Sequence, residues 1–187
     1  MIGQIRPCPE VDYRFVDRIT GGAIPKQFVP ACDAGFRAAL EQGPLLGAPV
    51  VGVEVELSDG GIHPQDSSEL AFRKAARDAM RAALLAAAPV VLEPIMVVEV
   101  ECPGEESFQG RVQTSLIRRR GTITATRTRG PACVIVAEVP LAELFGYAGE
   151  LRSLTQGRGE FTQEFARYAQ VPAQVQAALV RARADRG

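Results

Sequence analysis

The chain has 187 residues, a formal net charge of −1, 47% hydrophobic residues and 23% charged residues. This composition is typical of a globular protein and excludes a largely disordered one. The length allows one large domain or two small ones, and the near-neutral charge means that any contact with nucleic acid depends on local basic patches.

The sequence carries no mark of secretion or of insertion into a membrane. It contains no uncharged apolar run of about 18 residues, and its first ten residues lack a hydrophobic signal core. The four cysteines form no CxxC pair and the only histidine has no zinc-like neighbours in sequence. We therefore expect a cytoplasmic protein with free thiols and no metal site.

The first elements along the chain are a strand over residues 13–19 and a helix that begins at Pro25. The turn between them, residues 20–22, contains two glycines. Proline suits the first turn of a helix, and the apolar residues that follow it recur every four positions. Gly43 is expected to end this helix.

A second strand and a second helix follow in the first half. Residues 51–57 alternate apolar and polar side chains, which is typical of a strand with one buried face. The turn over residues 59–61 ends that strand. Asp66, with Glu69 three residues later, fits a capping box for a helix that runs to Pro89. The first half is thus predicted to have the order β-α-β-α.

The second half is predicted to follow a different order, β-α-β-β-α-β, which is the ferredoxin-like arrangement. A last helix beginning at Pro172 is expected to pack back onto the body. The elements expected from the periodicity are a strand over 95–102, a helix over 105–120, strands over 122–128 and 133–139, a helix over 141–151 and a strand through 161–165.

No catalytic motif is present, and we predict that the chain is not an enzyme. The sequence has no GxxxxGK[ST], GxGxxG, GxSxG or HExxH pattern. His63 stands near Asp59 and Asp66, but no nucleophile accompanies them. An exposed turn residue is the simpler interpretation of His63, and it also suits a probe that reaches into a partner. The loop over residues 20–25 also has glycines followed by a proline. For this loop and for the loop that contains His63, a plain connecting turn remains an open interpretation.

The run Arg118-Arg119-Arg120 has two interpretations, which the sequence leaves open. Cations are favoured at the end of a helix by its dipole, and Gly121 follows as a stop. Alternatively, these arginines form a basic surface for RNA phosphates together with others farther along. The other members of that surface are Arg127, Arg129, Arg152 and Arg158.

Phe145 lies on the apolar stripe of the helix over 141–151, whereas two other side chains of this helix fall off that stripe. Tyr147 and Arg152 are therefore expected to face outward, as residues of an interface often do. Gly157 and Gly159 on either side of Arg158 are also explained by the release of the chain from a helix into a strand.

Several separated segments occur in a distinctive order along the chain. They are RITGGAIPK (18–26), DGGIHPQDSSE (59–69), VLEPIMVVEV (91–100), RRRGTI (118–123), VPLAELFGYAGELRS (139–153) and TQGRGEF (155–161). In this order they resemble the fourth and fifth domains of elongation factor G, a translational GTPase, and the resemblance covers roughly residues 13–179.

The resemblance implies an α+β fold of two small domains. Residues 1–89 would form a ribosomal-protein-like β-α-β-α domain with a left-handed crossover, against the usual right-handed preference. Its opening strand is expected to be replaced by the short segment 1–11. Residues 90–187 would form the ferredoxin-like domain with a C-terminal helix.

The resemblance also implies where the chain contacts other molecules. Two tip loops would bind RNA at the tRNA-mRNA duplex, and a second surface would contact the ribosome. The tip-loop residues are Gly21, Gly22, Ala23, Ile24, Gly60, Gly61 and His63. The residues of the second surface are Arg118, Arg119, Arg120, Tyr147, Arg152 and Arg158.

By resemblance, the partners are the ribosome at its decoding site and factor-binding region, ribosomal RNA and tRNA-mRNA, with the chain itself a monomer. GTP and magnesium would belong to a GTPase domain that this sequence lacks, so no cofactor is expected here. The implied function is a role in translocation. The alternatives are a free-standing ribosome- or protein-binding regulatory module, or a competitor that occupies the factor site.

Overall fold

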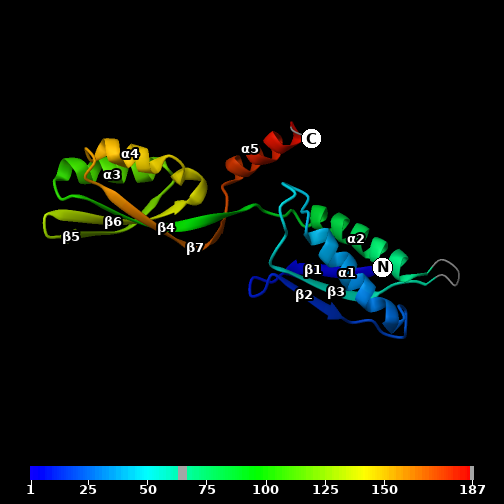
Figure 1. Cartoon of the computed structure of the whole chain (residues 1–187). Helices are drawn as coiled ribbons and strands as arrows, with labels where there is room; N and C mark the ends of the chain where they lie inside the picture. The colour runs from blue at the N-terminus through cyan, green and yellow to red at the C-terminus, as the bar shows by residue number, and fades with distance from the viewer. Residues whose placement is uncertain (63–66, 186–187) are drawn as a thin grey trace. The chain divides into compact units, whose positions relative to one another are not determined.

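The computed structural model describes residues 1–62 and 67–185, and it divides the chain into two compact units (Figure 1). Unit 1 consists of Met1–Val91 and Ala173–Gly187, and unit 2 of Leu92–Pro172. The fold is a mixed α+β fold with two small units, as the sequence predicted. The last helix groups with unit 1, whereas the division made from the sequence placed it with the second half.

The sheet of unit 1 has three strands in the order β1-β3-β2. They are β1 (Ile2–Pro7), β2 (Tyr13–Asp17) and β3 (Val53–Asp59). The expectation that the opening segment replaces a strand is wrong, because β1 pairs antiparallel with β3 along its whole length. Only Ile5 of β1 is even half-buried, so the segment gives no clear alternation of apolar side chains.

The crossover of unit 1 joins β2 to β3, which are parallel neighbours. The chain leaves β2, passes through a 3-10 turn (Lys26–Phe28) and α1 (Val29–Leu40), and returns as β3. The left-handed sense of this connection stays a prediction. Parallel pairing places the carboxyl ends of β2 and β3 at the same edge of the sheet, which decides where the following loops lie.

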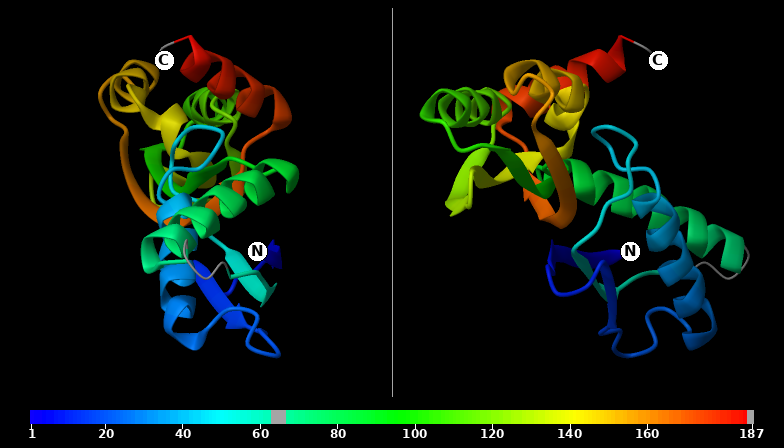
Figure 2. Two further views of the ribbon diagram at one scale, coloured as in Figure 1. Left: turned by 90° about the vertical axis from the view of Figure 1, so that its right-hand side faces the viewer. Right: turned by 60° about the vertical axis from the view of Figure 1, so that its left-hand side comes forward.

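Two helices, α1 and α2 (Glu69–Ala86), lie side by side over one face of this sheet (Figures 1 and 2). A Cβ atom on Gly35 of α1 would lie 2.7 Å from the Cβ of Ala76 in α2, so the helices approach closely at this point. Their shared core contains Cys32, Phe36, Leu40, Val55, Leu57, Phe72, Met80 and Leu84.

The N-terminus of α2 is capped by Ser68, whereas the sequence pointed to Asp66. The hydroxyl of Ser68 accepts a hydrogen bond from the backbone N–H of Ala71 at 3.2 Å. Serine is among the residues preferred at this position, because its oxygen satisfies a donor that the helix leaves free. Asp66 lies outside the described residues.

Unit 2 has the predicted order β-α-β-β-α-β. Its sheet has the strand order β5-β6-β4-β7, and every neighbouring pair is antiparallel. Both helices pack on one face of that sheet (Figure 1), where Val112, Leu116 and Leu151 meet buried residues of β4 and β6. The elements are β4 (Leu92–Pro103), α3 (Glu106–Arg118), β5 (Thr122–Arg129), β6 (Ala132–Pro140), a 3-10 turn (Leu141–Leu144), α4 (Tyr147–Leu154) and β7 (Glu160–Gln170).

The last helix, α5 (Ala173–Ala184), contacts unit 1 through polar groups and has no buried residue. The backbone N–H of Val91 donates to the side-chain oxygen of Gln176 at 2.8 Å. The guanidinium of Arg183 donates to the carbonyl of Leu46. The sequence predicted that this helix packs back onto the body, and these two hydrogen bonds provide contacts of that kind.

Candidate nucleic-acid interface

Two loops leave the sheet of unit 1 at the same edge. The first tip loop, residues 18–25, follows β2, and the second tip loop, described for residues 60–62, follows β3. The backbone N–H of Arg18 donates to the carbonyl of Leu57 at 2.9 Å and continues the pairing of the strands by one residue. The prediction that the loops lie at one end of the sheet is therefore confirmed by the strand pairing.

Each tip loop follows an aspartate that accepts a hydrogen bond from the backbone just after it. The Oδ1 of Asp17 accepts from the N–H of Ile19 at 2.9 Å. The Oδ1 of Asp59 accepts from the N–H of Gly60 at 2.7 Å. Such side-chain contacts stabilise turns, so both loops have a defined direction where they leave the sheet.

The first tip loop contains an exposed stretch of bare backbone. Gly21 and Gly22 have φ of +64° and +73°, both residues are exposed, and no atom lies within 4 Å of the position of an added Cβ. Positive φ is strained for residues with a side chain, so glycine is required here by conformation and not by crowding. The peptide groups are accessible to a partner that approaches closely.

Ile24 does not belong to the exposed surface to which the sequence assigned it. Its side chain is 1% exposed and is part of the core of unit 1. Ala23, its neighbour, is half-buried. The resemblance implied that Ile24 is one of the RNA-binding residues of the tip loops, but its apolar side chain turns inward where the loop joins the 3-10 turn.

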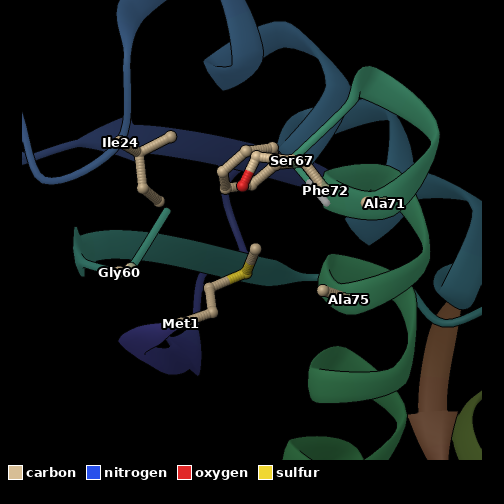
Figure 3. A pocket seen from close by; sticks show the side chains of 8 residues that line it. Met1, Ile24, Gly60, Ser67, Ala71, Phe72 and Ala75 are labelled. Atoms are coloured by element: carbon tan, nitrogen blue, oxygen red, sulfur yellow. The ribbon is translucent and has the colours of Figure 1, made fainter. Parts of the chain in front are cut away.

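An open pocket of about 140 Å³ lies beneath the tip loops (Figure 3). Ile24 lies on one side of it next to Gly60, while Phe72 and Ala75 of α2 form the opposite side. Met1 and Ser67 also line it. The pocket joins the first tip loop, the second tip loop and α2 in one small region.

The second tip loop presents an apolar side chain that the sequence analysis did not single out. Gly61 is exposed with no atom within 4 Å of an added Cβ, and Ile62 beside it is 54% exposed. His63, the residue on which the sequence interpretation of this loop centred, lies outside the described residues. The isoleucine beside the glycine is visible in the sequence, but no apolar periodicity there indicates that its side chain faces outward.

In unit 2, Arg119 is bound to a carboxylate and a backbone carbonyl of the chain itself. Its guanidinium lies 2.6 Å from Glu150, and it also donates to the backbone carbonyl of Glu143. The Ser115 hydroxyl donates to the other oxygen of Glu150 at 2.6 Å. The hydroxyl of Ser115 and the guanidinium of Arg119 together lower the pKa of Glu150. This arrangement joins α3 to α4.

Arg120 makes a second internal ion pair. Its guanidinium donates to both carboxylate oxygens of Glu93 and lies 3.6 Å from Glu143. The bond to Glu93 raises the pKa of Arg120. Both arginines thus fix the end of α3 through ion pairs, an explanation that neither of the two sequence interpretations included.

Tyr147 was expected to face outward, and that prediction is wrong. The side chain is fully buried in the core of unit 2 and meets the Phe161 ring edge-on at 5.1 Å. The guanidinium of Arg119 lies over the Tyr147 ring, 5.2 Å from the ring centroid. Gly146, with φ of +76°, separates the 3-10 turn from α4. A single helical wheel drawn through both segments therefore assigns the wrong face.

The remaining arginines of the predicted ribosome-contact surface are exposed. Arg118 and Arg152 lie on the exposed surfaces of α3 and α4. Arg158 lies over the Phe108 ring at 4.7 Å, and its guanidinium is 3.9 Å from Glu105. Three of the six residues in the predicted surface are thus available to a partner, and their contact with the ribosome stays a prediction.

Over residues 1–62 and 67–185, each helix is too short or too polar to span a membrane. Within the same residues, no three His, Cys, Asp or Glu side chains are grouped as metal ligands.

The comparisons with known proteins agree with this fold. Residues 1–88 match the family model described as elongation factor G, domain IV, and residues 90–179 match the model described as elongation factor G C-terminus. Together they define a translation elongation factor with two of its parts present. The chain belongs to the elongation factor G family.

Individual relatives are similar over nearly the whole chain. Elongation factor G 1 of Syntrophus aciditrophicus is 52% identical over 170 residues, which cover 91% of this chain and 24% of the relative. Elongation factor G 1 of Desulfotalea psychrophila is 48% identical over 180 residues, covering 96% and 26%. A crystal structure from Thermus thermophilus has a TM-score of 0.84 and 39% identity, covering 98% of this chain and 27% of its own. The chain thus spans about a quarter of the length of these relatives.

Proposed function

We propose that this chain serves translocation in protein synthesis as a ribosome-contacting part of an elongation factor G. The tip loops of unit 1 contact the tRNA-mRNA duplex at the decoding site, and the helical face of unit 2 contacts the factor-binding region. The observation that carries this proposal is the pair of loops at one sheet edge, where Gly21 and Gly22 expose bare backbone.

The proposed action is steric and electrostatic. Backbone N–H groups without side chains can approach phosphate or ribose closely, and protein contacts of this kind fix position on RNA. The tip occupies space that tRNA vacates and so opposes backward slippage. On unit 2, the exposed Arg118 and Arg152 supply the charge for contacts with RNA phosphates.

The same proposal assigns the chain no cofactor of its own. Neither matched family model is a GTPase domain, so GTP and magnesium belong to other parts of the family's proteins. We propose a cytoplasmic monomer that works with such parts or binds the ribosome without them. A purified chain that released phosphate from GTP would contradict this assignment.

The test is chemical probing of small-subunit RNA in ribosomes mixed with the 187-residue protein. Protection of decoding-site nucleotides is expected, and Gly22→Val should weaken it because valine is strained at φ of +73°. Gly130→Val is the matched control. Gly130 also has positive φ, +58°, with no atom within 4 Å of an added Cβ, but it lies in the β5–β6 turn of unit 2.

The outcomes separate the proposal from its alternatives. Protection that Gly22→Val reduces and Gly130→Val leaves intact supports the tip-loop contact. Absence of ribosome binding at low salt, together with a discrete protein partner, identifies a free-standing module and overturns the proposal. If both variants reduce protection equally, the effect of Gly22 is general strain and the tip is not the contact.

A further inference from the structure

Ile24 and Gly60 form a close contact between the two tip loops. Figure 3 shows the Ile24 side chain directed at Gly60. A Cβ added to Gly60 would lie 2.6 Å from the Cδ1 atom of Ile24 and 2.7 Å from its Cγ1. Carbon atoms in good contact are about 3.5–4.0 Å apart, so no residue with a side chain fits at position 60 while Ile24 keeps its place.

The requirement for glycine differs between the two loops. Gly21 and Gly22 have positive φ and open space around them, whereas the φ of Gly60 is outside the left-handed range. At Gly60 the constraint is therefore the side chain of Ile24, which belongs to the other loop. The two loops therefore contact each other where the buried side chain of Ile24 packs against Gly60, which has no side chain.

We propose that Ile24 is a positioning residue that holds the two tip loops together as one body. The inference rests on the proposed function, since it concerns the same tip. Near the sheet, the hydrogen bond from Arg18 to the carbonyl of Leu57 joins the start of the first tip loop to β3. Farther out, Ile24 rests against Gly60 and so sets the spacing between the loops beyond the last paired residues.

The direction of the expected displacement follows from the surroundings. Ile24 is fully buried, and the pocket of about 140 Å³ lies beside it, so there is room for its side chain to move without unfolding unit 1. An alanine at position 60 would force either Ile24 or the second loop back by about 1 Å. Where the backbone of Ile24 shifts together with its side chain, the exposed glycines move too, because Gly22 precedes Ile24 by two residues.

The first measurement needs no ribosome. Gly60→Ala is expected to shift the amide NMR signals of Gly21 and Gly22, although the change is in the other loop. Gly61→Ala is the matched control, because its added Cβ meets no atom within 4 Å. Combining Gly60→Ala with Ile24→Ala removes the colliding atoms and should return the Gly21 and Gly22 signals toward their original positions.

The second measurement connects positioning with function. Gly60→Ala should weaken decoding-site protection, and adding Ile24→Ala should recover part of it, whereas loss of folding alone would not be rescued in this way. If Gly60→Ala prevents folding, Ile24→Val, which removes only Cδ1, gives the reciprocal test through the amide signals of Gly60 and Gly61.

Unchanged Gly21 and Gly22 signals in a folded Gly60→Ala protein overturn the inference, as do equal shifts from Gly60→Ala and Gly61→Ala. The inference and the proposed function fail separately. If the shifts occur but the unaltered protein gives no decoding-site protection, the loops are coupled and the proposed function is wrong.

Discussion

We predict that removal of the buried hydroxyl of Tyr147 stabilises the protein. The Tyr147 oxygen is buried, and no hydrogen-bond partner for it is found among the described residues. Burial also raises the pKa of this phenol, as expected for a group removed from water. Tyr147→Phe removes only the oxygen and keeps the ring that packs on Phe161.

The size of the effect follows from the cost of leaving a polar group unpaired. A buried donor without a partner destabilises by about 1–3 kcal/mol, so Tyr147→Phe should raise the free energy of unfolding of unit 2 by about 1 kcal/mol. Tyr147→Ala also removes the ring and should lower that free energy by about 3–5 kcal/mol. Tyr168→Phe, at a tyrosine that is 62% exposed, should change little and is the matched control.

The assay must report unit 2 alone, since two units can unfold in separate steps. Hydrogen exchange of the β4 and β6 amides in dilute denaturant meets this need, because both strands belong to the buried sheet of unit 2. If Tyr147→Phe lowers the free energy of opening by about 1 kcal/mol or more, the hydroxyl is hydrogen-bonded and the reasoning is refuted.

Three further predictions concern unit 1. Gly35→Ala should destabilise it by about 2 kcal/mol in urea unfolding, because the added methyl meets the Arg73 carbonyl of the facing helix. Ser68→Ala should cost about 1 kcal/mol in the same assay through loss of the α2 cap. The hydrogen bond from Arg6 lowers the pKa of Glu54. Its stabilisation is therefore present above the ordinary carboxyl pKa of about 4.3 and lost as the pH falls through the lowered value. Glu54→Gln should accordingly flatten the acid limb of a stability-versus-pH curve.

The order of elements was predictable because apolar periodicity is a local property, and it persists over the long strands and helices of both units. Strand β1, which the sequence analysis did not predict, shows where apolar periodicity fails as a signal. Its residues are mostly exposed, and it is a strand because it pairs with β3, which lies about fifty residues later in the chain. This six-residue segment is a strand because of a distant partner, and it shows no apolar periodicity of its own.

The side chains around Gly146 show a different limit. The sequence interpretation took residues 141–151 as one helix, with Phe145 on the buried stripe and Tyr147 outside it. The structure has the reverse, with Phe145 79% exposed and Tyr147 buried. A 3-10 turn followed by a glycine at positive φ shifts the phase of the helix, and the sequence marks that break only by one glycine.

At the candidate site, the position of the loops was predictable and the role of Ile24 was not. Parallel strands predict which edge the loops share, and glycines predict where they turn. Which loop residue turns inward depends on what lies opposite, and for Ile24 this is Gly60, which comes from a separate part of the chain. A contact of this kind is set by tertiary packing and has no local sequence signal.

The glycines of the first tip loop have two opposing effects on its order. Glycine permits the positive φ of Gly21 and Gly22, but it also loses the most conformational entropy on becoming ordered. A rigid tip therefore needs anchors at both ends of its loops. Asp17 and Ile24 anchor the first loop, and Asp59 anchors the entry of the second. Each of these anchors lies where a loop joins a strand or a helix. Substituting an anchor should therefore change the conformation of the exposed glycines, although the glycines themselves are unchanged.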